Sequence, residues 1–128
     1  MNSITEIAEI AHETIRIYDQ TLGNYGQASW TLCEQWERDT VLNGVIAIEN
    51  GSVVVPKDSH ENWMKEKYDK GWVYGKEKNT DKSVGALTHP SLVPFDKLPD
   101  AQRTKDFLFF FITKILLGRA STYLGSVK

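Results

Sequence analysis

Apolar residues recur at helical spacing in several stretches of the chain, and these stretches predict its helices. The first is predicted to begin after Ser3, because Ser3 followed by Glu6 forms a capping box, and to end at Gly23. A loop over residues 24–36 leads to a second amphipathic helix, which ends at residues 49–52. A third helix is expected over roughly residues 59–70, closed by Gly71, and a last helix runs from residues 96–99 to about residue 117.

Short extended stretches separate these helices. Residues 72–74 predict a strand with Trp72 and Tyr74 on one face. Residues 75–88 have the composition of a loop, and residues 89–95 are expected to be extended because each proline restrains its predecessor. Residues 53–55 predict a further short strand or an extended link. The sequence therefore predicts a mainly α fold with short antiparallel β strands.

Two pairs of segments in the chain are similar to each other. Residues 11–23 and 59–71 both have His-Glu early, Tyr near the end and a closing Gly, and residues 34–46 are similar to 100–112. This predicts two quasi-repeated helix–extended–helix units related by a pseudo-twofold axis. We expect one domain over residues 1–128, with 1–52 as the degenerate first unit and 53–128 as the second. Chance matching of short helical patterns is the alternative.

Composition narrows the class of protein. The most apolar run, residues 107–118, is shorter than the roughly 18 residues that span a bilayer, and it carries Lys114. The N-terminus lacks the pattern of a signal peptide, and Cys33 is the lone cysteine. We therefore expect a cytoplasmic protein.

The charge is unevenly distributed along the chain. Residues 1–50 carry eight acids and two arginines, whereas residues 51–128 carry thirteen bases and nine acids. Either the two halves attract each other, or the second half presents a lysine-lined face to an anionic ligand. An isoelectric point near 5.9 argues against a long nucleic acid as partner.

Residues 60–106 resemble the RyR domain, the repeat named after ryanodine receptors. The similarity lies in His60-Glu61-x-Trp63, in Gly71-Trp72-x-Tyr74-Gly75, in the run from His89-Pro90 through Leu92-Val93-Pro94-Phe95 to Leu98, and in Asp106. The first half resembles the N-terminal part of free-standing bacterial and phage RyR-domain proteins. Phe95 stands where Tyr is common, and residues 83–88 are longer than usual.

The resemblance implies a mainly helical soluble domain with short strands and no established catalytic activity. For stand-alone prokaryotic members it implies recognition of nucleotide-derived or NAD-derived signals. It does not imply a channel.

The aromatic residues allow two interpretations. Trp63, Trp72, Tyr74 and Phe95 are expected to pack the helices onto the short sheet, but a ring edge left in a groove would stack on a nucleobase. Lysines and acids alternate from Lys65 to Lys82, which predicts a solvated face.

Within this stretch Lys76 and Lys82 are the candidate phosphate ligands, and Arg103 near the start of a helix is a third. His89 is a candidate ligand contact or a residue that fixes a turn. His12 and His60, at equivalent repeat positions, are expected to bond backbone or a carboxylate.

Neither a cofactor nor a metal site is expected, because the histidines lack zinc spacing, and neither a catalytic serine motif nor an activated cysteine is recognisable. The functional hypothesis is a non-enzymatic domain that binds a small anionic ligand such as a nucleotide or an ADP-ribose derivative. The setting would be sensing or sequestration in phage–bacterium conflict. The alternative is a protein-interaction or structural module with no small ligand, which would dock through the apolar last helix or the lysine-rich loop. A homo-oligomer formed through the helix at residues 107–117 is a further expectation.

Overall fold

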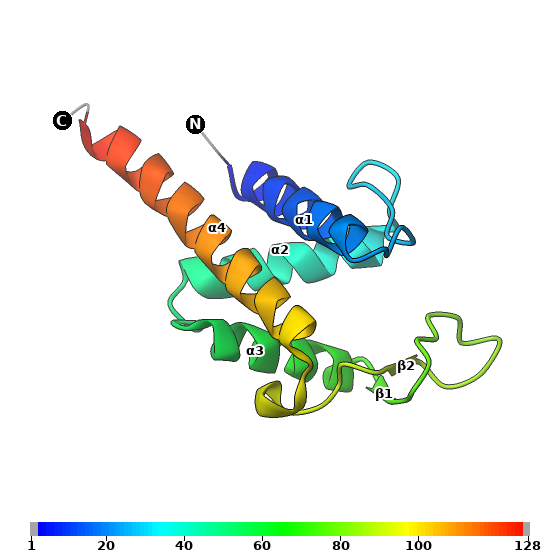
Figure 1. Cartoon of the computed structure of the whole chain (residues 1–128). Coiled ribbons are helices and arrows are strands. Elements are labelled where there is room, and N and C mark those ends of the chain that lie inside the picture. Colours follow the sequence, from blue (N-terminus) through cyan, green and yellow to red (C-terminus); the bar gives the residue numbers. More distant parts are fainter. Residues whose placement is uncertain (1–2, 127–128) are drawn as a thin grey trace.

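The computed structural model describes the backbone of residues 3–126 and the side chains of residues 3–118. In this range the chain forms α1 (Ile4–Thr21), α2 (Gln35–Glu49), α3 (Pro56–Asp69) and α4 (Asp100–Ser126) (Figure 1). Two-residue strands β1 (Val73–Tyr74) and β2 (Thr88–His89) and a short 3₁₀ helix, η1 (Phe95–Lys97), lie between α3 and α4. The prediction of a mainly α fold is confirmed.

The predicted helix ends follow from local sequence. The backbone N–H of Glu6 donates to Ser3 Oγ at 3.1 Å, and the N–H of Ser3 donates to Glu6 Oε1 at 3.0 Å, so the capping box is present. Gly23 and Gly71, which follow α1 and α3, have φ of 87° and 88°, a conformation that a residue with a Cβ rarely adopts.

Two helix boundaries differ from the prediction. α3 begins at Pro56, one turn earlier than expected, because proline fixes the φ angle that a first helical position needs. α4 continues past residue 117 to Ser126, since Gly118 keeps a negative φ there. A glycine inside a helix costs only about 1 kcal/mol, which is too little to force an end.

The strands pair in parallel, with Val73 opposite Thr88 and Tyr74 opposite His89, so the prediction of antiparallel strands is wrong. The loop that follows β1 makes the antiparallel contact instead, through a bridge between Asn79 and Thr88. β2 therefore lies between β1 on one side and the segment around Asn79 on the other. A Cβ at Gly75 would lie 2.6 Å from Thr88 Cβ, so this close approach requires glycine.

The core forms where α2 and α4 each pack against both α1 and α3. One buried cluster joins Ile7 and Ala8 of α1 to Trp30 and Val45, with Phe109 of α4 packed against it. Another contains Ala47, Ile48, Val53 and Phe110. Both clusters combine side chains from the two predicted units, so the apolar faces of the units are buried against each other.

The two units repeat the same contacts. His12 Nε2 lies 2.9 Å from the Ala28 carbonyl, and His60 Nε2 lies 2.8 Å from the Val93 carbonyl. In the same way Arg38 donates to the Cys33 carbonyl at 2.9 Å, and Arg103 donates to the Leu98 carbonyl at 2.7 Å. Each histidine fixes the extended segment after its helix, as the sequence predicted. The boundary between the units at residues 52 and 53 stays a prediction.

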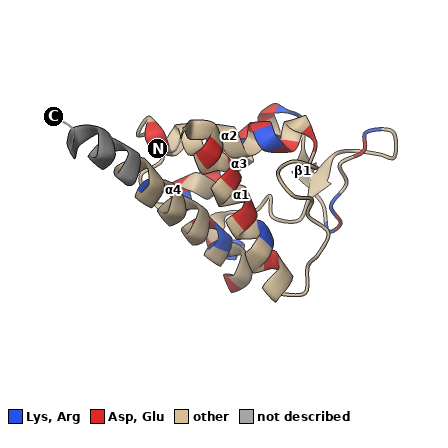
Figure 2. Ribbon diagram, turned by 90° about the horizontal axis from the view of Figure 1, so that it is seen from above, with Lys and Arg blue, Asp and Glu red and all other residues tan. Residues whose placement is uncertain are grey.

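One ion pair joins the acidic first half of the chain to the basic second half. Lys105 Nζ of α4 lies 2.6 Å from Asp19 Oδ1 of α1, which joins the two halves. The other Lys and Arg ion pairs in the described residues, such as Arg16 with Glu13 and Lys65 with Asp69, are local to one helix. Figure 2 shows α4 free of charged residues over most of its middle part.

Candidate functional site

Two tryptophans enclose a buried lysine where α2, α3 and β1 meet. Lys67 Nζ lies 4.9 Å from the ring centroid of Trp36 and 5.1 Å from that of Trp72, and it donates to Thr40 Oγ1 at 3.0 Å. Its side chain is only 3% exposed, so the interpretation of this lysine as part of a solvated face is wrong. Burial is also the main reason that the pKa of Lys67 is lowered.

His89 lies beside these rings. Its ring centroid is 4.9 Å from that of Trp63 and 6.5 Å from that of Trp72. The N–H of Ser91 donates to His89 Nδ1 at 3.0 Å, so the neutral ring carries its proton on Nε2. Trp36, Trp63, Trp72, His60 and His89 are called the aromatic junction below.

The surroundings of His89 are positively charged. Burial, followed by the charges of Lys78, Lys67 and Lys105, lowers the pKa of His89 to about 4. The imidazole is therefore neutral near pH 7, while several ammonium groups act on it. This is the clearest electrostatic feature of the aromatic junction.

An acid lies next to the junction on α4. Asp106 Oδ2 is 3.7 Å from His60 Nδ1, and burial raises the pKa of Asp106 to about 7, against the opposing charge of Lys105. Because His60 Nε2 faces the Val93 carbonyl, the neutral His60 ring donates through Nε2 and turns its Nδ1 lone pair toward Asp106. An ionised Asp106 is thus poorly compensated on this side.

The predicted site residues fall into separate groups. Trp63, Trp72 and His89 lie together in the aromatic junction, where Trp72 is 5% exposed. Tyr74 is 52% exposed, so it does not share the buried face of Trp72. Lys76 and Lys82 are also exposed.

The Arg103 guanidinium is already engaged. It donates to the carbonyls of Leu98 and Asp96 and pairs with Asp100, which fixes the chain at the start of α4. A phosphate would have to compete with these contacts. The roles proposed for all seven residues stay predictions.

Sequence reasoning missed Lys67 and Asp106 as neighbours of the candidate site, and it considered Trp36 as a stacking residue without placing it next to Trp72. Helical spacing from Trp63 to Lys67 was the available signal, because residues four apart lie on the same helix face. Trp36 belongs to the other unit, and no local pattern indicates that it approaches Trp72 to a centroid distance of 5.8 Å.

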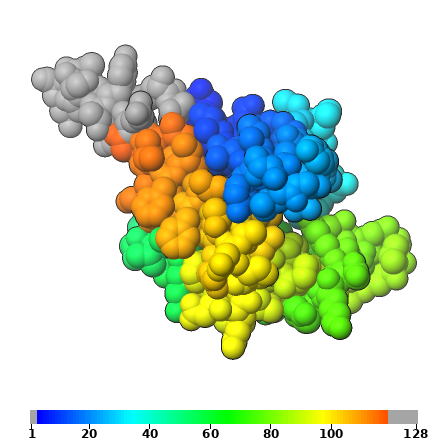
Figure 3. All heavy atoms as spheres, viewed as in Figure 1, coloured from blue at the N-terminus to red at the C-terminus, as the bar shows by residue number. Residues whose placement is uncertain are grey.

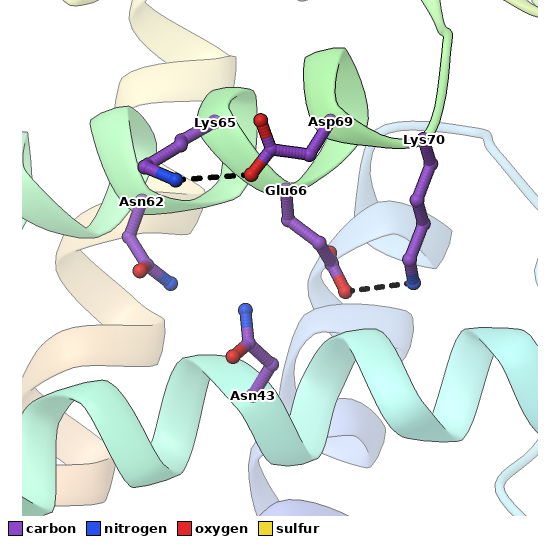
Figure 4. A pocket seen from close by; sticks show the side chains of 6 residues that line it. All are labelled: Asn43, Asn62, Lys65, Glu66, Asp69 and Lys70. Carbon is purple, nitrogen blue, oxygen red and sulfur yellow. Dashed lines mark hydrogen bonds and ion pairs between the residues drawn. The ribbon is translucent and has the colours of Figure 1, made fainter.

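A polar depression of about 400 Å³ lies between α2 and α3 (Figure 4). The Asn43 and Asn62 side chains point into the gap between the two helices. Lysines at its edge are paired within α3, Lys65 with Asp69 at 3.0 Å and Lys70 with Glu66 at 3.1 Å. With its cations already paired, the depression offers little net charge to a ligand.

An apolar groove of about 310 Å³ lies along α4 where it borders α1. Phe107, Phe111 and Ile115 follow one another at four-residue spacing and are 46%, 50% and 51% exposed. The full lining is Thr14 of α1 with Thr104, Phe107, Leu108, Phe111, Ile112 and Ile115 of α4. These residues are called the apolar groove below. The lining carries no charged residue, although a quarter of the chain is Asp, Glu, Lys or Arg.

The described residues contain neither a membrane-spanning helix nor a group of metal ligands. In residues 3–126 no helix has the length and apolarity needed to cross a membrane. Within the same part of the chain, no three His, Cys, Asp or Glu side chains are grouped so that they could hold a metal ion.

Comparison with known proteins gives one match. Residues 48–110 match the RyR domain family model, whereas no curated protein and no solved structure matches the chain. The matched range contains α3, both strands, η1 and the first turns of α4, and it includes His60, Trp63, Trp72, His89 and Asp106. The aromatic junction thus lies largely within the matched segment. This confirms the resemblance seen in the sequence: residues 48–110 are similar to the RyR domain family.

Proposed function

We propose that the chain is a protein-interaction module that binds a protein partner through the apolar groove. The match of residues 48–110 to the RyR domain family suggests a non-catalytic domain, which agrees with a binding role. The observation that carries the proposal is the row of half-exposed side chains Phe107, Phe111 and Ile115 beside an uncharged hollow. Contiguous apolar patches of this kind mark interaction surfaces.

Burial of the exposed side chains in the apolar groove would stabilise a complex. A half-exposed phenylalanine presents on the order of 100 Å² of apolar surface, and burying it contributes about 2.5 kcal/mol. Phe107 and Phe111 together with Ile115 therefore supply a cluster of the kind that dominates many interfaces. No charge in the lining has to be desolvated when a partner covers it.

Site-specific photo-crosslinking tests this proposal. A photoreactive phenylalanine analogue at position 111 should give protein adducts in cells, whereas the same analogue at Val84 should give few. Val84 is a suitable control because it is an exposed apolar residue in the loop after β1, away from the apolar groove. Equal adduct yields at the two positions would contradict a docking role for the groove.

A second candidate function is recognition of a small anion at the aromatic junction. The positive surroundings of His89, to which Lys78, Lys67 and Lys105 contribute, favour it. The ligand would be a nucleotide or an ADP-ribose derivative. Its base would stack on the ring of Trp63 or Tyr74, because the predicted Trp72 is only 5% exposed. Lys76, Lys82, His89 and Arg103 would contact its phosphates. Such binding would suit sensing or sequestration of a signal by a bacterial or phage protein.

Nuclear magnetic resonance titration of the histidines tests the second candidate. A bound anion near His89 should raise the pKa of that ring, because an opposite charge favours the imidazolium form. His12 is the control, since it lies in the first unit against the Ala28 carbonyl. A panel of nucleotides and ADP-ribose derivatives that leaves the titration of His89 and the melting temperature unchanged would contradict anion binding.

A further inference from the structure

The face that contains the apolar groove has both projecting and hollow parts. Phe107, Phe111 and Ile115 stand half exposed along α4, and the hollow runs beside them toward Thr14 of α1. In Figure 3, α4 (orange) and α1 (blue) lie side by side on one face of the molecule. A well-fitting partner must therefore present both a projecting apolar row and an apolar depression, and it must be uncharged where it makes contact.

A second copy of this chain meets all three requirements at once. We propose that two copies form a twofold dimer in which α4 packs antiparallel against its counterpart, with Phe111 near the axis. Phe107 of one copy then lies opposite Ile115 of the other, and each row enters the hollow of its partner. This is the self-complementary arrangement that a twofold axis demands of a single patch. The inference rests on the proposed docking role of the apolar groove.

The available area sets the strength of such a dimer. Ile10 and Ile17 lie one turn on either side of Thr14 on α1 and are also exposed, so they extend the apolar face. Five large side chains at on the order of 100 Å² each give about 500 Å² per copy, against about 800 Å² in a standard interface. An interface of this small size should give a weak dimer that forms only at high protein concentration.

Sedimentation equilibrium over a range of protein concentrations tests the dimer. The average mass should rise from 14.6 kDa toward twice that value as concentration increases. The Phe111→Glu variant should raise the dissociation constant at least tenfold, because dimerisation would then bury an unpaired carboxylate at the axis. Val84→Glu adds the same charge at an exposed apolar residue outside the groove and should leave the dissociation constant unchanged.

Disulfide trapping tests the register. A mixture of the Phe107→Cys and Ile115→Cys variants should form a covalent heterodimer under mild oxidation, at a higher yield than Phe107→Cys mixed with Val84→Cys. The native thiol interferes little, because Cys33 is buried, and burial with the charge of Glu37 raises its pKa. Equal yields in the two mixtures would overturn the antiparallel register.

The self-association proposal and the docking proposal fail in different ways. A wild-type mass of 14.6 kDa up to about 1 mM overturns the dimer. If position 111 still crosslinks specifically to a different protein, the groove remains a docking site with another occupant. If it crosslinks to nothing above the Val84 control, both proposals fail. Circular dichroism of Phe111→Glu shows whether a lost dimer reflects a lost fold.

Discussion

At the scale of single residues, Lys67 sets two effects against each other. The faces of Trp36 and Trp72 attract its ammonium group, and Thr40 accepts one hydrogen bond from it. Against this, the ammonium group is removed from water, and its nearest carboxylate oxygen, on Glu66, is 3.9 Å away. Burial lowers the pKa of Lys67 more than the charge of Glu66 raises it, so the nearby carboxylate does not compensate the loss of water.

Replacing Lys67 by methionine should therefore leave the free energy of unfolding unchanged or raise it by about 1–2 kcal/mol. Methionine fills similar space between the two indole rings and removes the buried charge. Thr40 stays satisfied, because its hydroxyl also donates to the Trp36 carbonyl at 3.0 Å. Chemical denaturation measures the change, with Lys65→Met on the exposed side of α3 as the control. A loss of more than about 2 kcal/mol would mean that the cation–π contacts outweigh desolvation.

Asp106 should make stability depend on pH. Its pKa is about 7 in the folded chain against 3.8 for an ordinary aspartate, so between these values the folded state holds the extra proton. Stability from this group is therefore present at low pH and lost as the pH rises to 7. His89, with its pKa lowered to about 4, has the opposite effect: its contribution to stability is lost as the pH falls from 6.5 to 4.

The Asp106→Asn variant removes only the contribution of the acid. Its free energy of unfolding should equal that of the wild type near pH 4 and should be higher at pH 8 by at most about 4 kcal/mol. Urea denaturation at the two pH values measures this, and Asp96→Asn at an exposed carboxylate is the control. A difference from wild type that is the same at both pH values would show that the pKa of Asp106 is the same in the folded and unfolded chains.

At the scale of elements, local signals were reliable and tertiary ones were not. Ser3 with Glu6, Gly23 and Gly71 marked helix ends correctly, because caps and left-handed turns depend on a few adjacent residues. The strand pairing was predicted wrongly, since β1 and β2 pair in parallel and the antiparallel bridge to Thr88 comes from Asn79. The direction of β2 depends on where the loop between Gly75 and Leu87 returns, and composition does not encode that path.

The parallel pairing makes Gly75 a sensitive position. An alanine there would place its Cβ 2.6 Å from Thr88 Cβ, and neither Cβ can move without its backbone. We expect Gly75→Ala to lower the free energy of unfolding by about 1–3 kcal/mol. Gly85→Ala is the matched control, because its nearest neighbour would be Asn79 Nδ2 at 4.0 Å. Equal melting temperatures for the two variants would show that β1 and β2 separate easily.

At the scale of the whole molecule, contacts between the two predicted units limit what the sequence could show. Helical spacing and the His-Glu pairs indicated two units, and the paired bonds of His12 and His60 agree with that reading. Which lysines would be buried could not be predicted, because burial arises where one unit covers the other. Lys67 against Trp36 and Lys105 against Asp19 are both contacts between the units.

Apolar contacts of α4 with residues before 53 should make the two parts of the chain fold together. The family match begins at residue 48, which invites the view that residues 53–128 fold alone. However, Phe109 of α4 packs against the cluster that contains Ile7, Ala8 and Val45. Phe110 belongs to the cluster that contains Ala47 and Ile48, and all five of these partners precede residue 53. A fragment of residues 53–128 would expose this side of α4 to water. It should show no cooperative thermal transition by circular dichroism at the melting temperature of the full chain, and adding a fragment of residues 1–52 should restore one. A 53–128 fragment that melts as the full chain does would mean that the second unit is stable by itself.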